Sequence, residues 1–229
     1  MVSNKIIKSD DILLKLCHSV SHILTTTTDS SISHAGMIQS ISRTRLKPDI
    51  GCFSIFDGGF SGLVIMNFSS DAAMDIYRRY MLNMGIQESD LAISFTSDEV
   101  SNVLGELMNQ ILGYFINKVS KELQTSIKQS QPKMLTVNRE LSISVDANLD
   151  APQARRVSFT TEDNHNFYLE FAMDKTEFIQ LDEFEFDEDF DPDSLIEIHG
   201  IDLPRKHQSA PKANPAVDSA DDLLDELGL

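Results

Sequence analysis

Two polar residues, Glu106 and Asn109, have types and spacing that could do chemistry together. They fall in a segment whose pattern predicts a helix over residues 98–123. On a helical wheel at about 100° per residue they lie about 60° apart on one face, in the i, i+3 relation that brings two side chains together. A carboxylate pairs with cations, whereas a carboxamide both donates and accepts hydrogen bonds without becoming charged. The pair could therefore bind a cationic group and orient a small polar molecule such as water.

The remainder of that helix predicts which way the pair faces. Its apolar residues form a stripe roughly 80° wide on the opposite side of the wheel, which predicts the buried face. The stripe consists of Val100, Leu104, Leu107, Ile111 and Phe115. Gly113 lies between Glu106 and Asn109 in angle, one turn further on, and Gly105 flanks the pair. Glycine within a helix costs about 1 kcal/mol relative to alanine, and on an exposed face it leaves backbone that a partner can approach closely.

An N-terminal helix is predicted over residues 10–25, where the apolar residues again form one stripe. That stripe consists of Ile12, Leu13, Leu16, Val20, Ile23 and Leu24. His18 and His22 are four residues apart on this helix, a spacing that could hold a metal ion, but no third ligand follows. We therefore interpret them as ordinary surface or boundary histidines and expect no metal site.

Cap residues predict where the two central helices begin. Ser70 is expected to cap a helix that ends near Gly85. Thr96 is followed three residues later by Glu99, a pattern that predicts a capping box at the start of the helix that carries Glu106.

Short strands are predicted on both sides of these two helices. The apolar runs at residues 52–56 and 61–68 flank an Asp-Gly-Gly sequence, which is a hairpin signal. Beyond Pro132, four more strands are predicted over residues 133–137, 141–145, 156–160 and 166–171. The predicted fold class is α+β.

Composition and charge narrow the class of protein. The net charge is −17, but residues 174–229 hold 17 acidic and four basic residues, so residues 1–173 carry only −4. This balance offers no basic surface for nucleic acid or an anionic membrane. No apolar run approaches the roughly 20 residues of a membrane span, and the N-terminus does not read as a signal peptide, so we expect a cytoplasmic protein. Cys17 and Cys52 lie among apolar residues and are predicted to be buried thiols.

The order of these elements carries a family resemblance that the polar pair alone does not, because exposed Glu and Asn residues are common on helices. Residues 58–82 read GGFSGLVIMNFSSDAAMDIYRRYML, and residues 97–119 read SDEVSNVLGELMNQILGYFINKV. They resemble the CheX family, of the CheC/CheX/FliY class of chemotaxis phosphatases. That family has a glycine-containing hairpin strand, an apolar strand ending in F-S-x-x-x-A, a helix, and a helix with G-E-L-x-N and a glycine four residues on. The last motif here is Gly105-Glu106-Leu107-Met108-Asn109, followed by Gly113.

This resemblance implies a fold, an activity and a partner. The fold is an α+β domain with helices packed on a mainly antiparallel sheet, here followed by an acidic C-terminal extension. The family's substrate is the phosphoaspartate of a CheY-like receiver domain; the Mg²⁺ is supplied by that receiver and none is bound by the phosphatase. Glu106 and Asn109 are the implied catalytic pair, with Asn109 positioning the water and Glu106 docking a receiver lysine, and Gly105 and Gly113 lie on the implied partner-binding face. Relatives form dimers, and a homodimer is left open because no residue of this sequence decides it.

The C-terminal residues predict a second contact with the receiver. The sequence ADDLLDELGL resembles the C-terminal receiver-binding peptide of CheZ, a phosphatase of unrelated fold. Asp222 supports a cap by Ser219, and the apolar side of the short helix consists of Leu223, Leu224 and Leu227. A helix of about nine residues is marginal in water, so we expect it to fold on its partner. The predicted divisions are a CheX-like domain (1–173), an acidic extension (174–203), a flexible linker (204–217) and the receiver-binding peptide (218–229).

The leading hypothesis is therefore a phosphatase of protein aspartyl-phosphate. The second is a non-catalytic module that binds a response regulator, or an adaptor in a flagellar switch, through the same face and tail. The third is a structural protein with no receiver partner. For the tail alone, the alternative is an acidic segment that only increases solubility. The sequence leaves open which receiver is bound and whether the pathway is chemotaxis.

Overall fold

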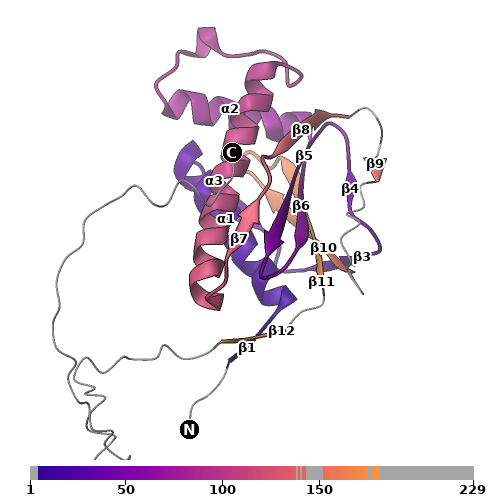
Figure 1. Ribbon diagram of the computed structural model, residues 1–229. Coiled ribbons are helices and arrows are strands. Elements are labelled where there is room, and N and C mark those ends of the chain that lie inside the picture. Colours follow the sequence, from indigo (N-terminus) through magenta and orange to yellow (C-terminus); the bar gives the residue numbers. More distant parts are fainter. Residues whose placement is uncertain (1–4, 138, 140, 143–151, 175–176, 181–229) are drawn as a thin grey trace, which may run out of the picture. The chain divides into compact units, whose positions relative to one another are not determined.

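The computed structural model describes residues 5–137, 139, 141–142, 152–174 and 177–180 (Figure 1). Within these ranges there are three α-helices, α1 (Ser9–Thr28), α2 (Ser70–Asn83) and α3 (Asp98–Leu123), and a short 3-10 helix, η1 (Glu88–Asp90). Met1–Asp182 forms one unit of the chain, and Glu183–Leu229 forms a second unit that lies outside the described residues.

An antiparallel sheet is the other layer of the fold, and eight strands belong to it in the described part of the chain. The strand order is β2-β10-β11-β6-β5-β7, with β3 also pairing with β10 and β8 also pairing with β5. The strands are β2 (Ser33–His34), β3 (Gln39–Ile41), β5 (Ile50–Gly58), β6 (Gly62–Phe68), β7 (Ile127–Gln129), β8 (Lys133–Thr136), β10 (Pro152–Thr160) and β11 (Asn166–Asp174). Two smaller ladders join β1 (Lys5–Lys8) to β12 (Glu177–Gln180) and β4 (Arg45–Leu46) to β9 (Leu141–Ser142). The predicted α+β class is confirmed.

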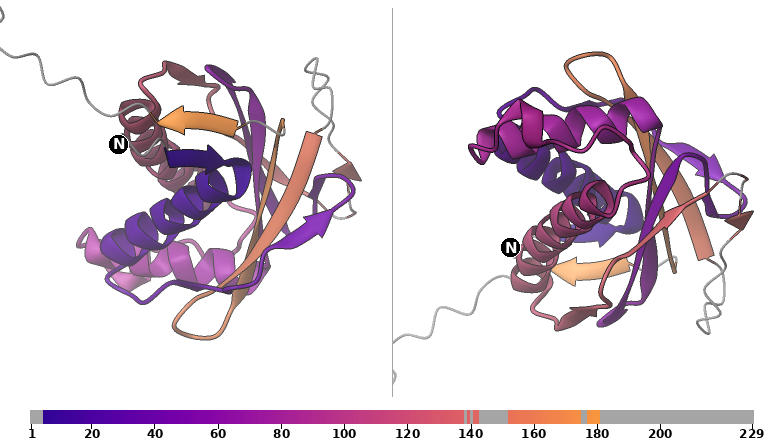
Figure 2. Two further views of the ribbon diagram at one scale, coloured as in Figure 1. Left: turned by 90° about the horizontal axis from the view of Figure 1, so that it is seen from below. Right: turned by 90° about the horizontal axis from the view of Figure 1, so that it is seen from above.

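The two faces of the sheet are covered differently. All three helices lie on one side of the curled sheet, and β4 and β9 lie on the other (Figure 2). Leu46 of β4 packs against Leu63 and Ile65, which point away from the helices. Strand β6 is therefore buried along its whole length, which explains why residues 63–66 form a continuous apolar run rather than an alternating one.

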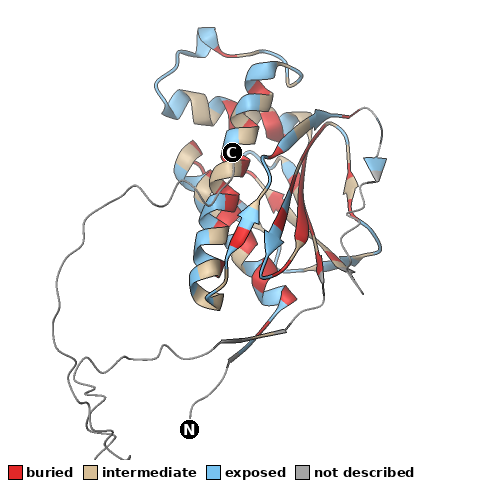
Figure 3. Cartoon of the chain, in the orientation of Figure 1, coloured by how far each residue is buried: buried red, intermediate tan, exposed pale blue. Residues whose placement is uncertain are grey.

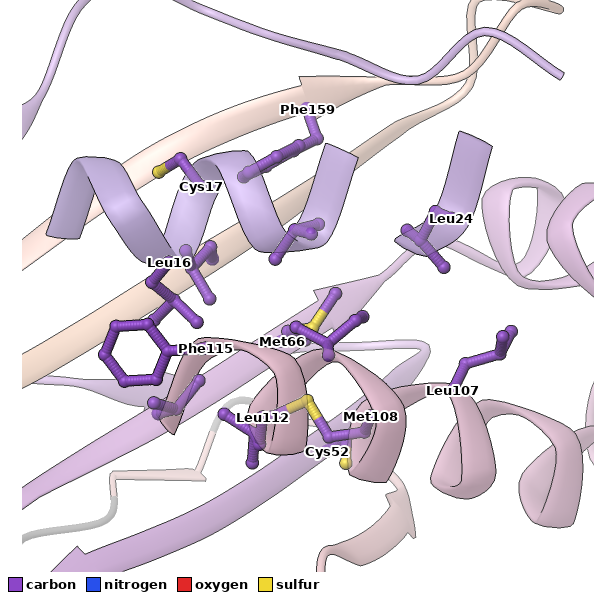
Figure 4. Packing of buried hydrophobic residues seen from close by; sticks show 14 of the residues in the cluster. Leu16, Cys17, Leu24, Cys52, Met66, Leu107, Met108, Leu112, Phe115 and Phe159 are labelled. Carbon is purple, nitrogen blue, oxygen red and sulfur yellow. The ribbon is translucent and has the colours of Figure 1, made fainter. Parts of the chain in front are cut away.

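The main core lies between the helices and the sheet. Figure 3 shows buried residues concentrated in the central strands and on the inward sides of the helices. In Figure 4, side chains of α3 meet side chains of α1 and of β5 and β6. These include Leu107, Met108, Leu112 and Phe115 from α3, Leu16, Cys17 and Leu24 from α1, and Cys52 and Met66 from the sheet. Both thiols are buried as predicted, and burial raises the pKa of Cys17 and of Cys52 to about 12.

The helix caps differ by one residue from the prediction. At the start of α2, Ser69 and not Ser70 accepts a hydrogen bond from the backbone of Ala72. At the start of α3, the cap is Ser97 and not Thr96. The predicted capping box is also wrong, since Glu99 accepts a hydrogen bond from the hydroxyl of Tyr77 on α2. Ser and Thr can both cap a helix. Ser69 also donates to the backbone oxygen of Asn166, whereas Thr96 forms local hydrogen bonds with Ser94.

The connection after α3 contains a strand that was not predicted. Strand β7 pairs with the end of β5, where Gly58 adopts a φ of 143°. A side chain at Gly58 would collide with the carbonyl group of Ser126, so the predicted hairpin turn also permits the close approach of β7. At three residues, β7 is too short to show a pattern of its own.

Strand β12 is the last element in the described part of the chain. It pairs with β1 over residues 177–180, and Phe178 contacts the ring of Phe60 at a centroid distance of 5.4 Å. The predicted linker and receiver-binding peptide lie outside the described residues.

Candidate functional site

Helix α3 presents Glu106 and Asn109 on the side that faces away from the core. The hydroxyl of Ser97 caps its first turn, and Gln124 ends it in the left-handed conformation. All five residues of the predicted apolar stripe are buried, as are Met108, Leu112 and Val119. Because this face is anchored, the opposite face reaches solvent: Glu106 is exposed and Asn109 is half-buried.

A shallow hollow of about 430 Å³ lies beside this pair. One wall comes from α3 and consists of Ser101, Asn102, Gly105, Glu106 and Asn109. The other wall is the segment that enters β8, and consists of Gln131, Pro132, Lys133 and Met134. The structure therefore brings three predicted site residues, Gly105, Glu106 and Asn109, into one concave surface. The second wall was missed because β8 reaches α3 only through its pairing with β5, about 80 residues earlier in the chain.

Gly105 lets strand β8 come close to the helix. A Cβ atom at this position would lie 3.5 Å from Cγ of Met134, which is already van der Waals contact. Since Met134 points toward α3, the alternation of side chains along a strand directs Lys133 toward the opposite face. Lys133 also lines the hollow, and from this alternation we infer that its side chain is directed away from that of Met134.

The two polar side chains have different surroundings. The side-chain Nε2 of Gln110 donates a hydrogen bond of 3.1 Å to Oε1 of Glu106. By contrast, the carboxamide of Asn109 has no hydrogen-bond partner among the residues that the structure describes. A half-buried carboxamide without a partner can still donate and accept, so it can orient a molecule that enters the hollow.

Gly113 lies outside the hollow, one turn further along α3. It is exposed, and beyond its chain neighbours and the nearby backbone of its own helix, no described atom lies within 4 Å of the place a Cβ would occupy. Next to it, the ring of Tyr114 is 37% exposed and lies 5.0 Å from the ring of His22 on α1. The Nζ of Lys118 lies 5.3 Å from the centroid of the same ring. The accessible face of α3 therefore continues smoothly from the hollow toward α1.

The two histidines of α1 each contact another aromatic ring. His22 contacts Tyr114, and the ring of His18 lies 5.6 Å from that of His34. Over the described ranges no group of three or more His, Cys, Asp or Glu residues has the geometry of a metal site. In the same ranges, no helix has the length and apolar character that crossing a membrane requires.

A second hollow, of about 380 Å³, contains a network of ion pairs between α2 and the β10–β11 turn. Arg79 donates to Asp163 and to Asp75 at 2.7 Å each. These hydrogen bonds raise the pKa of Arg79, and Arg79 in turn lowers the pKa of Asp163. Arg79 also pairs with Glu162, which accepts a further hydrogen bond from Ser30. Arg79 and these three carboxylates pair with one another, so we interpret this network as structural.

The predicted tail site is not described by the structure. Asp222, Leu223, Leu224 and Leu227 all lie in residues 181–229, outside the described ranges.

Comparisons with known proteins add a family and a fold. A family model described as a protein of unknown function, DUF3334, matches residues 3–229. No curated protein matches the sequence. Among solved structures, the chemotaxis protein CheX from Desulfovibrio desulfuricans superposes with a TM-score of 0.57 at 16% identity, covering 72% of this chain and 99% of that chain.

Two further solved structures have the same fold as the Desulfovibrio desulfuricans CheX. A CheC-like superfamily protein from Shewanella sp. PV-4 has a TM-score of 0.58 at 16% identity and covers 72% of this chain and 97% of that chain. CheX in the CheX–CheY–BeF3–Mg²⁺ complex from Borrelia burgdorferi has a TM-score of 0.53 at 15% identity, covering 72% and 99%. The described domain therefore has the CheX fold.

Proposed function

Since the chain belongs to the DUF3334 family and has the fold of CheX, we propose that it is a cytoplasmic phosphatase that accelerates hydrolysis of the phosphoaspartate of a CheY-like receiver domain. The main support is the placement of Glu106 and Asn109 together at one hollow on the accessible face of α3. A CheX of the same fold has been crystallised in a complex with CheY, BeF3 and Mg²⁺. The hollow is open and shallow, which suits a protein partner that carries the reacting group into it.

Asn109 is the residue we assign to the water. An acyl phosphate is already activated, so its hydrolysis requires mainly a water molecule held in line with the leaving oxygen. The carboxamide of Asn109 is half-buried and has no partner among the described residues, so both of its polar atoms are available to that water. It can orient the water without changing its own charge.

Glu106 is the residue we assign to docking. Its carboxylate is exposed and forms no ion pair among the described residues, so it can pair with a lysine of the receiver. Pairing would fix the orientation of the receiver on α3 and leave the phosphoryl group free for attack. In this proposal the Mg²⁺ is held by the receiver, and no residue of this chain forms a covalent intermediate.

The C-terminal peptide is proposed as a tether for the same receiver. Its predicted amphipathic helix would bind a groove of the receiver through Leu223, Leu224 and Leu227, and Asp222 would stabilise the helix N-terminus. The linker at residues 204–217 would span roughly 20 Å as a flexible coil, which raises the effective concentration of the bound receiver.

The test is a phosphate-release assay with a panel of phosphorylated receiver domains in the presence of Mg²⁺. We expect one or a few receivers to lose phosphate faster than they do alone, and Asn109→Ala to abolish that acceleration while the complex still forms. A complex without any acceleration would support the non-catalytic binding module instead. The absence of both a complex and an acceleration with every receiver would refute the proposal.

A further inference from the structure

Gln110 follows Glu106 by one turn of α3 and holds its carboxylate. The hydrogen bond from Nε2 of Gln110 to Oε1 of Glu106 measures 3.1 Å. Gln110 is half-buried and does not line the hollow, although Glu106 does. The contact therefore connects a residue at the edge of the hollow to one outside it.

The direction of this contact separates Glu106 from Asn109. At about 100° per residue, Gln110 lies about 40° from Glu106 on one side, and Asn109 lies about 60° from it on the other. A carboxylate that turns toward Gln110 turns away from Asn109. This explains why the two neighbouring side chains do not bond to each other, and it leaves the Asn109 carboxamide available. It also moves a negative charge away from the place where an anionic phosphoryl group would enter.

The chemical type of Gln110 matters as much as its position. A glutamine amide is a neutral donor, so it orients the carboxylate without cancelling its charge. Only Oε1 is engaged, and the other oxygen can accept from a cation. A lysine at this position would form the more stabilising i, i+4 pair for a helix, but it would occupy the carboxylate with a competing cation.

We propose that Gln110 is a positioning residue that orients Glu106 for pairing with a cationic group of the receiver and keeps it away from Asn109. This inference rests on the proposed function, and it assigns to Gln110 an effect on docking rather than on the chemical step.

The experiment measures kcat and KM for the phosphorylated receiver with the full-length chain and its variants. Gln110→Ala is expected to raise KM about twofold with kcat nearly unchanged, which is the scale of one exposed contact between side chains four residues apart on a helix. Gln110→Lys is expected to raise KM more than Gln110→Ala does, although it stabilises the helix. In a Glu106→Ala background, neither change should affect KM. Asn117→Ala, another exposed residue of α3, is the matched control and should match the wild type.

Three outcomes would overturn parts of this reasoning separately. If Gln110→Lys has a KM equal to or below that of the wild type, Gln110 acts only through helix stability and the inference fails. If Glu106→Ala raises KM but both Gln110 variants match the wild type, the docking role of Glu106 stands and only this inference fails. If Glu106→Ala leaves KM unchanged, the docking step of the proposed function fails together with it.

Discussion

Arg79 on α2 has three carboxylate partners, whereas Asn109 on α3 has no hydrogen-bond partner among the described residues. Both side chains are partly accessible and both line a hollow of similar volume. The difference lies in what the neighbouring elements supply. The β10–β11 turn supplies Glu162 and Asp163 to Arg79, but no ion pair or hydrogen bond joins the start of β8 to Asn109 in the described part of the chain.

This contrast separates polar groups that hold the fold together from polar groups that remain available. The sheet contains a stronger example of the first kind: Glu170 is 0% exposed and accepts hydrogen bonds from Arg156 and from the backbone of Arg45. Loss of a partner from such a group should lower stability. Loss of Asn109 should lower activity and leave stability unchanged.

The largest expected effect is a loss of stability when the buried ion pair between Arg156 and Glu170 is broken. Arg156→Met should lower the free energy of unfolding by about 3 kcal/mol, because it removes a charged partner of the buried carboxylate of Glu170. The measurement is urea unfolding followed by circular dichroism. Arg155→Met is the matched control: Arg155 pairs with Asp10, whose side chain is 56% exposed, so its loss should cost less than about 1 kcal/mol. Equal losses of unfolding free energy in Arg156→Met and Arg155→Met would contradict the distinction between the buried and the exposed ion pair.

The next largest expected effect is a loss of activity when the carboxamide of Asn109 is removed. If Asn109 orients the attacking water as proposed, Asn109→Ala should reduce the rate of receiver dephosphorylation about a hundredfold, because that water is no longer held in line. Its unfolding free energy should stay within about 0.5 kcal/mol of the wild type. Asn117→Ala, two turns further along the same helix, should change neither quantity. A stable Asn109→Ala protein with full activity would remove Asn109 from the mechanism.

A smaller loss of stability is expected in the network on α2. Arg79→Gln should lower the unfolding free energy by about 1–3 kcal/mol, because it weakens the pairing of Asp75, whose side chain is 7% exposed and whose Oδ2 already has no partner. The neighbouring change Arg78→Gln alters an exposed residue and should have almost no effect. Phosphatase activity at a temperature where all three proteins are folded should be the same.

The smallest effect is the pH dependence of this network. Arg79 lowers the pKa of Asp163 below its usual range, so the ionised carboxylate favours the folded state. This contribution is present above the pKa of an unfolded Asp, about 4, and is lost as pH falls through the lower pKa of the folded protein. Thermal unfolding of the wild type and Asp163→Asn should differ by a constant amount at neutral pH and converge below about pH 4. A difference that grows in acid would show the opposite sign of coupling.

Local patterns were sufficient to predict most of the helical structure. The apolar stripes of α1 and α3 are spaced by the helical repeat, so their buried faces could be read directly, apart from Ile23, which is only half-buried. The same repeat placed Glu106, Asn109 and Gly113 away from the core. Errors arose where the choice depended on distant residues, as with Ser69 at the cap of α2 and with the short strand β7. The cap of α3 was missed for a local reason, because Thr96 bonds to Ser94.

The sequence by itself therefore determined the faces of α3 and the identity of the pair that reaches solvent, because helical periodicity is a local property of the chain. Only the tertiary structure decided that this face borders a hollow. That result depends on β8 pairing with β5 and on Met134 packing beside Gly105, contacts that join residues far apart in the chain. The tertiary structure also decided which polar groups are occupied. Arg79 meets carboxylates more than 80 residues away, while Glu106 meets only a neighbour on its own helix and Asn109 meets none among the described residues.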